Sequence, residues 1–222
     1  MKKDKRKLLL PLLLLLLLIG LGGTVAWLTS TDTLVNEFTV GDIKSPTTDP
    51  EDPTTPISVT GNLYEKKWDS TATHKLVPGV SFDKEPYVGI GVGSEKSVVY
   101  LYVENDFTNK VYFTINSGWV PVTGHVTAAV AGAPANSYTS GLFLYGTDAS
   151  TPTILDATSA DAWTTSLFDE VVVDSTANTA DFTANATTNI TVKSLVHQAY
   201  DATGTTQVPI ATIQQAAIDT LE

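Results

Sequence analysis

From residue 57 onwards, short apolar runs alternate with clusters of Asn, Asp, Gly, Ser and Pro. Short runs with period-two alternation are typical of strands, and the clusters between them are typical of turns. The predicted strands cover residues 57–60, 87–92, 98–103, 111–115, 142–145, 170–174 and 189–196. The run at 98–103 is apolar throughout, so we expect it to be a central strand. Seven or more short strands predict an antiparallel β-sandwich.

Two segments have a helical pattern instead. Residues 161–168 are predicted to form a short turn of helix. Near the end of the chain, apolar residues recur at helical spacing after Pro209, a residue type favoured at helix starts. These apolar residues are Ile210, Ile213, Ala217 and Leu221. We therefore expect a mainly β domain over residues 57–222, with a short C-terminal helix lying on the sandwich.

The first 27 residues have the pattern of an export signal. Basic residues dominate positions 2–7, and a leucine-rich apolar run follows over 8–19. A membrane-spanning helix needs about 20 apolar residues, so this run is short for a permanent anchor. Small residues precede a predicted signal peptidase site after Ala26 or Trp27. We expect a secreted protein, extracellular or at the cell surface; the alternative is an uncleaved anchor reaching Leu28.

Residues 28–43 directly follow the signal and are a candidate assembly strand. Its apolar members are Leu34, Val35, Phe38, Val40 and Ile43. A groove on another subunit could take alternate side chains of such a strand while the backbone supplies the ladder of hydrogen bonds. The alternative is that the same residues form the first strand of their own sandwich.

Residues 44–56 separate this strand from the domain. They contain four prolines and three acidic residues and have no other apolar side chain. Proline fixes φ and donates no backbone hydrogen bond, so the segment is predicted to be an extended linker. Such a linker would hold residues 28–43 away from the domain.

Charge and composition exclude several classes of function. The chain has a net charge of −11, and removal of residues 1–26 leaves 8 basic and 23 acidic residues, a net charge of −15. This charge opposes binding to nucleic acid or to anionic lipid. The chain has no cysteine, so neither disulfides nor thiol chemistry support it, and its stability must come from a core.

No motif in the sequence indicates a catalytic centre, a cofactor or a metal. The histidines are His74, His125 and His197. None belongs to a metal-binding pair or to a helix of the His-Glu-x-x-His type, and no nucleophile elbow or phosphate-binding loop is present. Acidic residues at 49–52 and around Asp174 and Asp181 lack calcium-loop spacing, so we interpret them as solvated charge, with calcium as the alternative. We therefore do not expect an enzyme.

Glycine alternates with apolar residues over positions 89–93. The pattern continues a strand and no helix follows it, so it is not a dinucleotide fingerprint. Alternate glycines leave one face of a strand bare, which predicts a close backbone approach or an edge where another strand can lie. The alternative is a structural role, a bulge or a tight packing site.

Several short motifs, in order along the chain, resemble the TasA/camelysin-like proteins, which are surface and biofilm-matrix proteins of Gram-positive bacteria. The most specific are Gly23-Thr24-Val25-Ala26-Trp27-Leu28-Thr29 and Asn36-Glu37-Phe38-Thr39-Val40-Gly41-Asp42-Ile43. The others are Leu63-Tyr64-Glu65-Lys66-Lys67-Trp68-Asp69, Leu76-Val77-Pro78-Gly79, Lys84-Glu85-Pro86-Tyr87-Val88, Leu167-Phe168-Asp169 and Gln198-Ala199. The proline-rich insert at 44–56 departs from the pattern expected for the family.

The resemblance implies a jelly-roll-like sandwich, processing by a SipW-type signal peptidase and self-assembly into extracellular fibres. The expected partner is therefore a second copy of the chain, joined head to tail, with an accessory fibre subunit as a further possibility. Two alternatives stay open. One is a camelysin-type metallopeptidase, for which the sequence offers no metal triad. The other is an adhesin or carbohydrate-binding module that uses aromatic residues such as Trp119 and Trp163.

Overall fold

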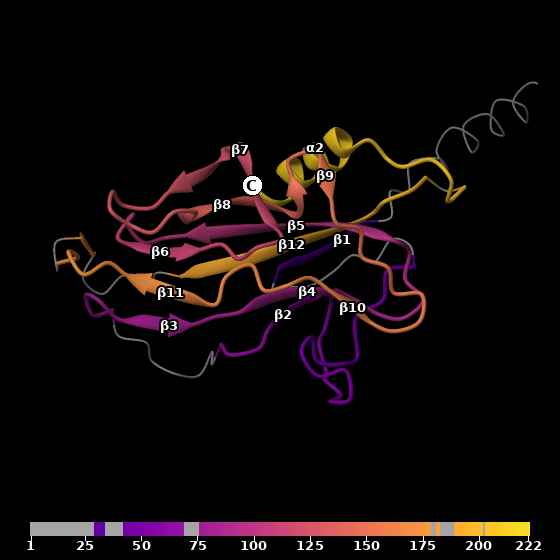
Figure 1. The fold of residues 1–222 in the computed structure, drawn as a ribbon, viewed down its shortest axis with the longest axis horizontal. Coiled ribbons are helices and arrows are strands. Elements are labelled where there is room, and N and C mark those ends of the chain that lie inside the picture. Colours follow the sequence, from indigo (N-terminus) through magenta and orange to yellow (C-terminus); the bar gives the residue numbers. More distant parts are fainter. Residues whose placement is uncertain (1–28, 34–41, 69–75, 179–180, 183–188, 202) are drawn as a thin grey trace, which may run out of the picture.

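The structure is a computed structural model that describes residues 29–33, 42–68, 76–178, 181–182, 189–201 and 203–222; for residues 29–33 it describes the backbone. The strands are β1 Thr29–Thr33, β2 Leu63–Glu65, β3 Ser81–Asp83, β4 Pro86–Ile90, β5 Ser97–Asn105, β6 Val111–Thr114, β7 Trp119–Ala128, β8 Ser137–Asp148, β9 Thr151–Pro152, β10 Ala162–Trp163, β11 Glu170–Val173 and β12 Ile190–Gln198. One helix, α2 Ile210–Leu221, lies near the C-terminal end. The fold class is the predicted one, mainly β with a short C-terminal helix (Figure 1).

The strands form two antiparallel sheets. The large sheet has the order β1-β12-β5-β8-β6-β11-β3, with β7 and β9 also paired to β8, and the small sheet has the order β10-β4-β2. The long strand β8 pairs with β6 near Tyr138 and with β5 over residues 141–144. The large sheet is curled, and Figure 1 shows the small sheet opposite β5 and β12. The arrangement is sandwich-like, as the strand pattern predicts, but the predicted strand at residues 57–60 is wrong, because the structure assigns no strand there.

Strand β5 explains why residues 98–103 are apolar throughout. Its side chains alternate between two buried faces. Val99, Leu101 and Val103 lie in the core between the sheets, together with Val88 of the small sheet. Tyr100 lies in a second cluster with residues of α2. The predicted central position of this strand is confirmed, because β5 pairs with β12 on one side and with β8 on the other.

The helix α2 covers the outer face of the large sheet (Figure 1). Pro209 directly precedes it, and its buried residues Ile213, Ala217 and Leu221 are spaced four apart, as predicted. The prediction of helix over residues 161–168 is wrong. Trp163 belongs instead to β10, which pairs with β4. Its indole N–H donates a hydrogen bond to the Thr48 carbonyl oxygen (3.1 Å), so a long-range contact overrides the local pattern.

The glycines of residues 89–93 permit two close approaches. A Cβ atom at Gly89 would lie 2.4 Å from the ring of Trp163, and one at Gly91 would lie 2.3 Å from the Ser45 carbonyl oxygen. Both distances are too short for any side chain larger than hydrogen. The structural interpretation of the glycine run is therefore confirmed, and it explains how residues 44–56 reach β4.

Residues 44–56 differ from an extended linker. An isolated bridge joins Thr48 to Pro56, and the Asp49 N–H donates to the Thr55 carbonyl oxygen (2.9 Å). The segment therefore folds back on itself and lies against the small sheet, where the Asp161 carboxylate and the indole of Trp163 bind its backbone. We call residues 44–56 the docked segment. Composition missed this because two of its main partners, Asp161 and Trp163, are more than 100 residues away.

Candidate functional site

Most of the predicted assembly and processing residues lie outside the described part of the chain. These are Ala26, Trp27, Leu34, Val35, Phe38 and Val40. Ile43 is described, and only 3% of it is exposed. It packs in the core between the two sheets with residues such as Val88 and Ile90. Ile43 thus anchors the start of the docked segment in its own domain.

The backbone of residues 29–33, strand β1, lies at one edge of the large sheet. It pairs antiparallel with β12, from Thr29 opposite His197 to Thr33 opposite Lys193. The strand consists of Thr, Ser and Asp, residue types that seldom supply hydrophobic anchors. The described contact between β1 and the domain is therefore a backbone ladder, which does not depend on a particular sequence.

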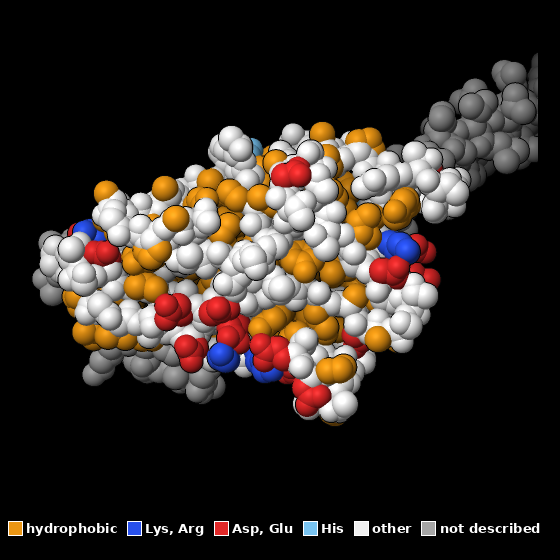
Figure 2. Space-filling model, viewed as in Figure 1, with side chains coloured by type: hydrophobic (Ala, Val, Ile, Leu, Met, Phe, Trp, Pro, Cys, Tyr) orange, Lys and Arg blue, Asp and Glu red, His pale blue; other side chains and the backbone are white. Residues whose placement is uncertain are grey.

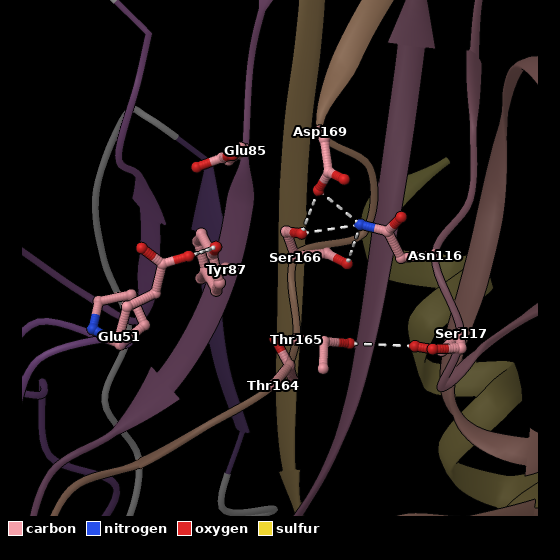
Figure 3. A pocket seen from close by; sticks show the side chains of 10 residues that line it. Glu51, Glu85, Tyr87, Asn116, Ser117, Thr164, Thr165, Ser166 and Asp169 are labelled. Carbon is pink, nitrogen blue, oxygen red and sulfur yellow. Dashed lines mark hydrogen bonds between the residues drawn. The ribbon is translucent and has the colours of Figure 1, made fainter.

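A polar cavity of about 490 Å³ lies beside the small sheet (Figure 3). Its lining residues are Pro50, Glu51, Glu85, Tyr87, Asn116, Ser117, Thr164, Thr165, Ser166 and Asp169. They come from the docked segment, from β4 and the residue before it, from the turn before β7 and from residues 164–169.

Backbone hydrogen bonds hold three of these four parts together, all except the docked segment. The Thr164 N–H donates to the Val88 carbonyl oxygen (2.9 Å), and the Lys84 N–H donates to the Asp169 carbonyl oxygen (3.0 Å). Residues 164–169 therefore run alongside β4. The Asn116 N–H donates to the Leu167 carbonyl oxygen (2.8 Å), which brings the turn before β7 to the same place.

One wall of the cavity is a hydrogen-bonded network around Asp169. The Asn116 amide donates to the Ser166 hydroxyl (2.8 Å) and to Asp169 Oδ1 (2.7 Å). The Ser166 hydroxyl donates to the same carboxylate oxygen (2.7 Å), and the Thr165 hydroxyl donates to the Ser117 carbonyl oxygen (3.2 Å) (Figure 3). The side-chain donors of this wall are thus engaged with one another.

The opposite wall contains Tyr87 and Glu51. The Tyr87 hydroxyl donates to Glu51 Oε1 (3.0 Å), and burial together with this carboxylate raises the pKa of the tyrosine above its ordinary value. Lys66 lies 2.7 Å from Glu51 Oε2 and 2.9 Å from Asp49 Oδ1. Hydrogen bonds from Lys66 and Tyr87 lower the pKa of Glu51. The docked segment is therefore joined to the domain by a charged contact at this wall.

Further ion pairs lie beside the cavity, where Figure 2 shows acidic and lysine side chains gathered on the surface. Lys67 lies 2.5 Å from Glu85, and the buried Lys84 lies 2.6 Å from Glu65. The Lys84 ammonium also lies 4.5 Å from the centre of the Trp68 ring. Burial lowers the pKa of Lys84, although Glu65 opposes this shift.

The two histidines that the structure describes have local hydrogen-bond partners. His74 lies outside them. His125 Nδ1 is 2.8 Å from the Glu222 carboxylate, and His197 Nδ1 is 2.7 Å from the Gln198 carbonyl oxygen. His197 is 1% exposed, and burial lowers its pKa. No group of three His, Cys, Asp or Glu side chains within the described ranges is placed to hold a metal ion.

The acidic residues singled out in the sequence have local partners. Asp174 Oδ1 accepts a hydrogen bond from the Thr176 N–H (2.8 Å), and Asp181 Oδ2 accepts one from the Asn178 N–H (2.8 Å). Asp49 is paired with Lys66. The sequence interpretation of simply solvated charge is therefore incomplete, because these carboxylates stabilise turns and the docked segment.

Sequence reasoning did not identify the cavity, although three of the motifs quoted above meet beside it. The first motif ends β2 and continues past it, with Glu65, Lys66 and Lys67. The second contains Glu85 and Tyr87 in the β4 region. The third contains Asp169, which follows the buried pair Leu167 and Phe168. Within each of these motifs, the spacing of the polar residues matches no known metal-binding or catalytic motif. Only the fold shows that these polar residues surround one space.

Comparisons of the chain with family models, with curated proteins and with solved structures find no match. Among the residues that the structure describes, no helix has both the length and the apolar character needed to cross a membrane.

Proposed function

We propose that this protein is a secreted structural protein that assembles into extracellular fibres or a cell-surface matrix by donating its N-terminal strand to the next subunit. The export signal supports the location, and the absence of catalytic motifs from the sequence supports a non-enzymatic role. The resemblance of the N-terminal motifs to fibre-forming surface proteins supports the type of assembly.

The pairing of β1 with β12 is the observation on which this proposal depends. Edge strands expose backbone groups that can pair with another chain. If β1 left its place, the edge of β12 from Lys193 to His197 would offer its N–H and C=O groups to an incoming strand. An equivalent β1 from another copy would restore the same ladder, so exchange would preserve the backbone pairing.

The burial of Ile43 limits which residues are donated. Because Ile43 packs in the core of its own domain, the donated part would end before it. Residues 34–41 would then connect the donated strand to the donor domain. We therefore expect the residues of β1 to pair with β12 of the next subunit. The connection between the two subunits would then contain Leu34, Val35, Phe38 and Val40.

A donated strand makes a head-to-tail contact, since each subunit offers one strand and one edge. Such a contact does not close on itself unless a rotation forms a ring, so it produces filaments. The strong negative charge of the chain opposes nonspecific association, which leaves assembly to a specific contact.

A pair of cysteines tests the proposal directly. Thr33 and Lys193 are register partners, and the natural chain has no cysteine. Directly opposed residues in an antiparallel pair have Cα atoms about 4.5–5.5 Å apart, which is compatible with a disulfide. In the variant Thr33→Cys/Lys193→Cys, oxidation of assembled material is expected to give a ladder of covalent oligomers on a denaturing gel. Oxidation of dilute, unassembled protein is expected to give a cross-linked monomer.

The single variants Thr33→Cys and Lys193→Cys serve as matched controls and should give at most dimers. A cross-linked monomer as the only product of oxidised filaments would contradict strand donation. That result would mean that β1 stays on its own domain while the protein assembles through another surface.

A further inference from the structure

The polar cavity has an excess of hydrogen-bond acceptors. Its lining includes three carboxylates, Glu51, Glu85 and Asp169, and no Lys, Arg or His. The side-chain donors of Tyr87 and Asn116 are already directed at the carboxylates or at Ser166. The three carboxylates therefore favour a molecule that brings its own donors.

Glu85 is the residue on which the inference rests. Its side chain is 6% exposed, and only Oε1 is paired, with Lys67. The second oxygen, Oε2, is buried and has no hydrogen-bond partner. A buried carboxylate oxygen without a donor costs free energy, which a ligand that supplies an N–H group would recover. Glu85 lines the cavity (Figure 3), so a rotation of its carboxylate would present this oxygen to such a ligand.

We propose that this cavity binds an organic cation, an ammonium or guanidinium group carried by a small amine or by a basic side chain of another protein. The three carboxylates of the lining match a positive charge and oppose an anion. A bound metal ion is disfavoured, since no three acidic or histidine groups of the described residues converge as ligands. A cation satisfies Glu85 Oε2 and joins Lys67 as a second partner of this carboxylate.

A bound cation would also connect two parts of the fold. Glu51 belongs to the docked segment, whereas Glu85 and Asp169 belong to the domain. A positive group that contacts both would add a second link between the docked segment and the domain, beside the contact that Lys66 makes with Glu51 at the same wall. Occupancy of the cavity is therefore expected to hold residues 44–56 more firmly, whether or not the protein forms fibres.

The test is a titration of the purified protein with two probes, cadaverine and a lysine-rich peptide, followed by calorimetry and by NMR. We expect saturable binding and shifts of the Asn116 side-chain amide and of the backbone near Glu85. Glu85→Gln should weaken binding about tenfold, the loss of one charge-assisted hydrogen bond. Glu104→Gln is the matched control, because Glu104 is an exposed glutamate that pairs with Lys193 on the large sheet, and it should leave binding unchanged.

Binding of cadaverine alone would identify a small amine, and binding of the peptide alone would identify a basic protein segment. Equal weakening by both substitutions, or shifts spread over the whole acidic surface, would overturn the proposal in favour of nonspecific attraction. The absence of shifts at Asn116 in the unsubstituted protein would overturn it as well, even if Glu85→Gln failed to fold. The result does not depend on filament formation, so it is separate from the fate of the fibre proposal.

Discussion

The Asp161 carboxylate accepts a hydrogen bond from the Thr47 backbone N–H at 2.6 Å across 114 residues of sequence. The same carboxylate accepts bonds from the Thr48 N–H (2.9 Å) and, through its other oxygen, from the Val92 N–H (2.9 Å). One side chain thus joins the docked segment, the glycine-containing turn after β4 and the start of β10. This relationship explains how a proline-rich segment becomes part of the domain.

The first prediction concerns this carboxylate. Asp161→Ala should lower the free energy of unfolding by about 1–3 kcal/mol, because several backbone donors lose their acceptor. It should also release the docked segment, so a glutamate-specific protease should cut at Glu51 faster than in the unsubstituted protein. Asp148→Asn is the control, since Asp148 caps only its own turn at Ser150. Equal cutting rates for all three proteins would show that Asp161 does not hold the segment.

The second prediction is a pH dependence with a defined sign. Burial alone would raise the pKa of Asp161, but hydrogen bonds from the Thr47 and Val92 backbones outweigh it and lower the pKa below 3.8. A lowered folded-state pKa stabilises the fold above pH 3.8, and this contribution is lost as the pH falls through the folded-state pKa. The protection factors of the Thr47 and Thr48 amides, which are exchange rates corrected for the intrinsic effect of pH, should therefore fall more steeply below pH 3.8 than those of amides in β5. In Asp161→Asn this difference in steepness should disappear, and its persistence would assign the effect to another acid.

The third prediction concerns Gly89 and Trp163. Gly89→Ala should lower the free energy of unfolding by about 1–3 kcal/mol, because its Cβ would lie 2.4 Å from the indole ring. In a Trp163→Ala background the same substitution should cost much less, since the ring is absent. Urea unfolding of the four proteins of this double-mutant cycle measures the coupling. Additive effects would show that the close approach does not constrain position 89.

The fourth prediction compares two lysines. Lys84 is 2% exposed and pairs with Glu65, so Lys84→Ala should cost about 3–5 kcal/mol in free energy of unfolding by leaving a buried carboxylate alone. Lys96 pairs with Asp156 on the surface, and Lys96→Ala should cost at most about 1 kcal/mol. Chemical denaturation at neutral pH gives both values. Similar small costs would mean that water reaches Glu65 when Lys84 is removed.

Local patterns in the sequence predict the central parts of this fold well. The apolar run at 98–103 predicts a central strand because both faces of β5 are buried. The helix α2 is predictable because one face of it is buried, through Ile213, Ala217 and Leu221 at four-residue spacing. Strand β7 escaped detection because Pro121 and Gly124 interrupt its alternation, and the structure places a register shift between Pro121 and Val126. Patterns of period two cannot identify a strand that bends at such a point.

The docked segment and the cavity could not be predicted from local patterns, because their contacts join distant parts of the chain. Composition describes residues 44–56 as a linker, and nothing nearby in sequence reveals the acceptor at Asp161 or the small residues at Gly89 and Gly91. The cavity has the same origin, since Glu51, Glu85 and Asp169 are ordinary polar residues until the fold brings them together. The predicted assembly residues before position 42 lie outside the described ranges, apart from the backbone of β1.

The last prediction concerns β1 itself. Removal of residues 28–33 from protein produced without the signal peptide should leave a folded domain, since the described contact of β1 is a backbone ladder at a sheet edge. Ile43 is retained in this deletion, so the core keeps a side chain that is only 3% exposed. The shortened protein should have a melting temperature within a few degrees of the unshortened one, yet it should form no filaments in electron micrographs.

Two point variants separate the ladder from the side chain. Thr31→Pro removes a backbone donor from the register opposite Leu195, whereas Thr31→Ala keeps it. We expect Thr31→Pro to reduce the number and length of filaments and Thr31→Ala to preserve them, because the proposed contact uses the backbone. Filaments of unchanged length in both the deletion and the proline variant would rule out strand donation by β1 and direct attention to another edge, such as β3.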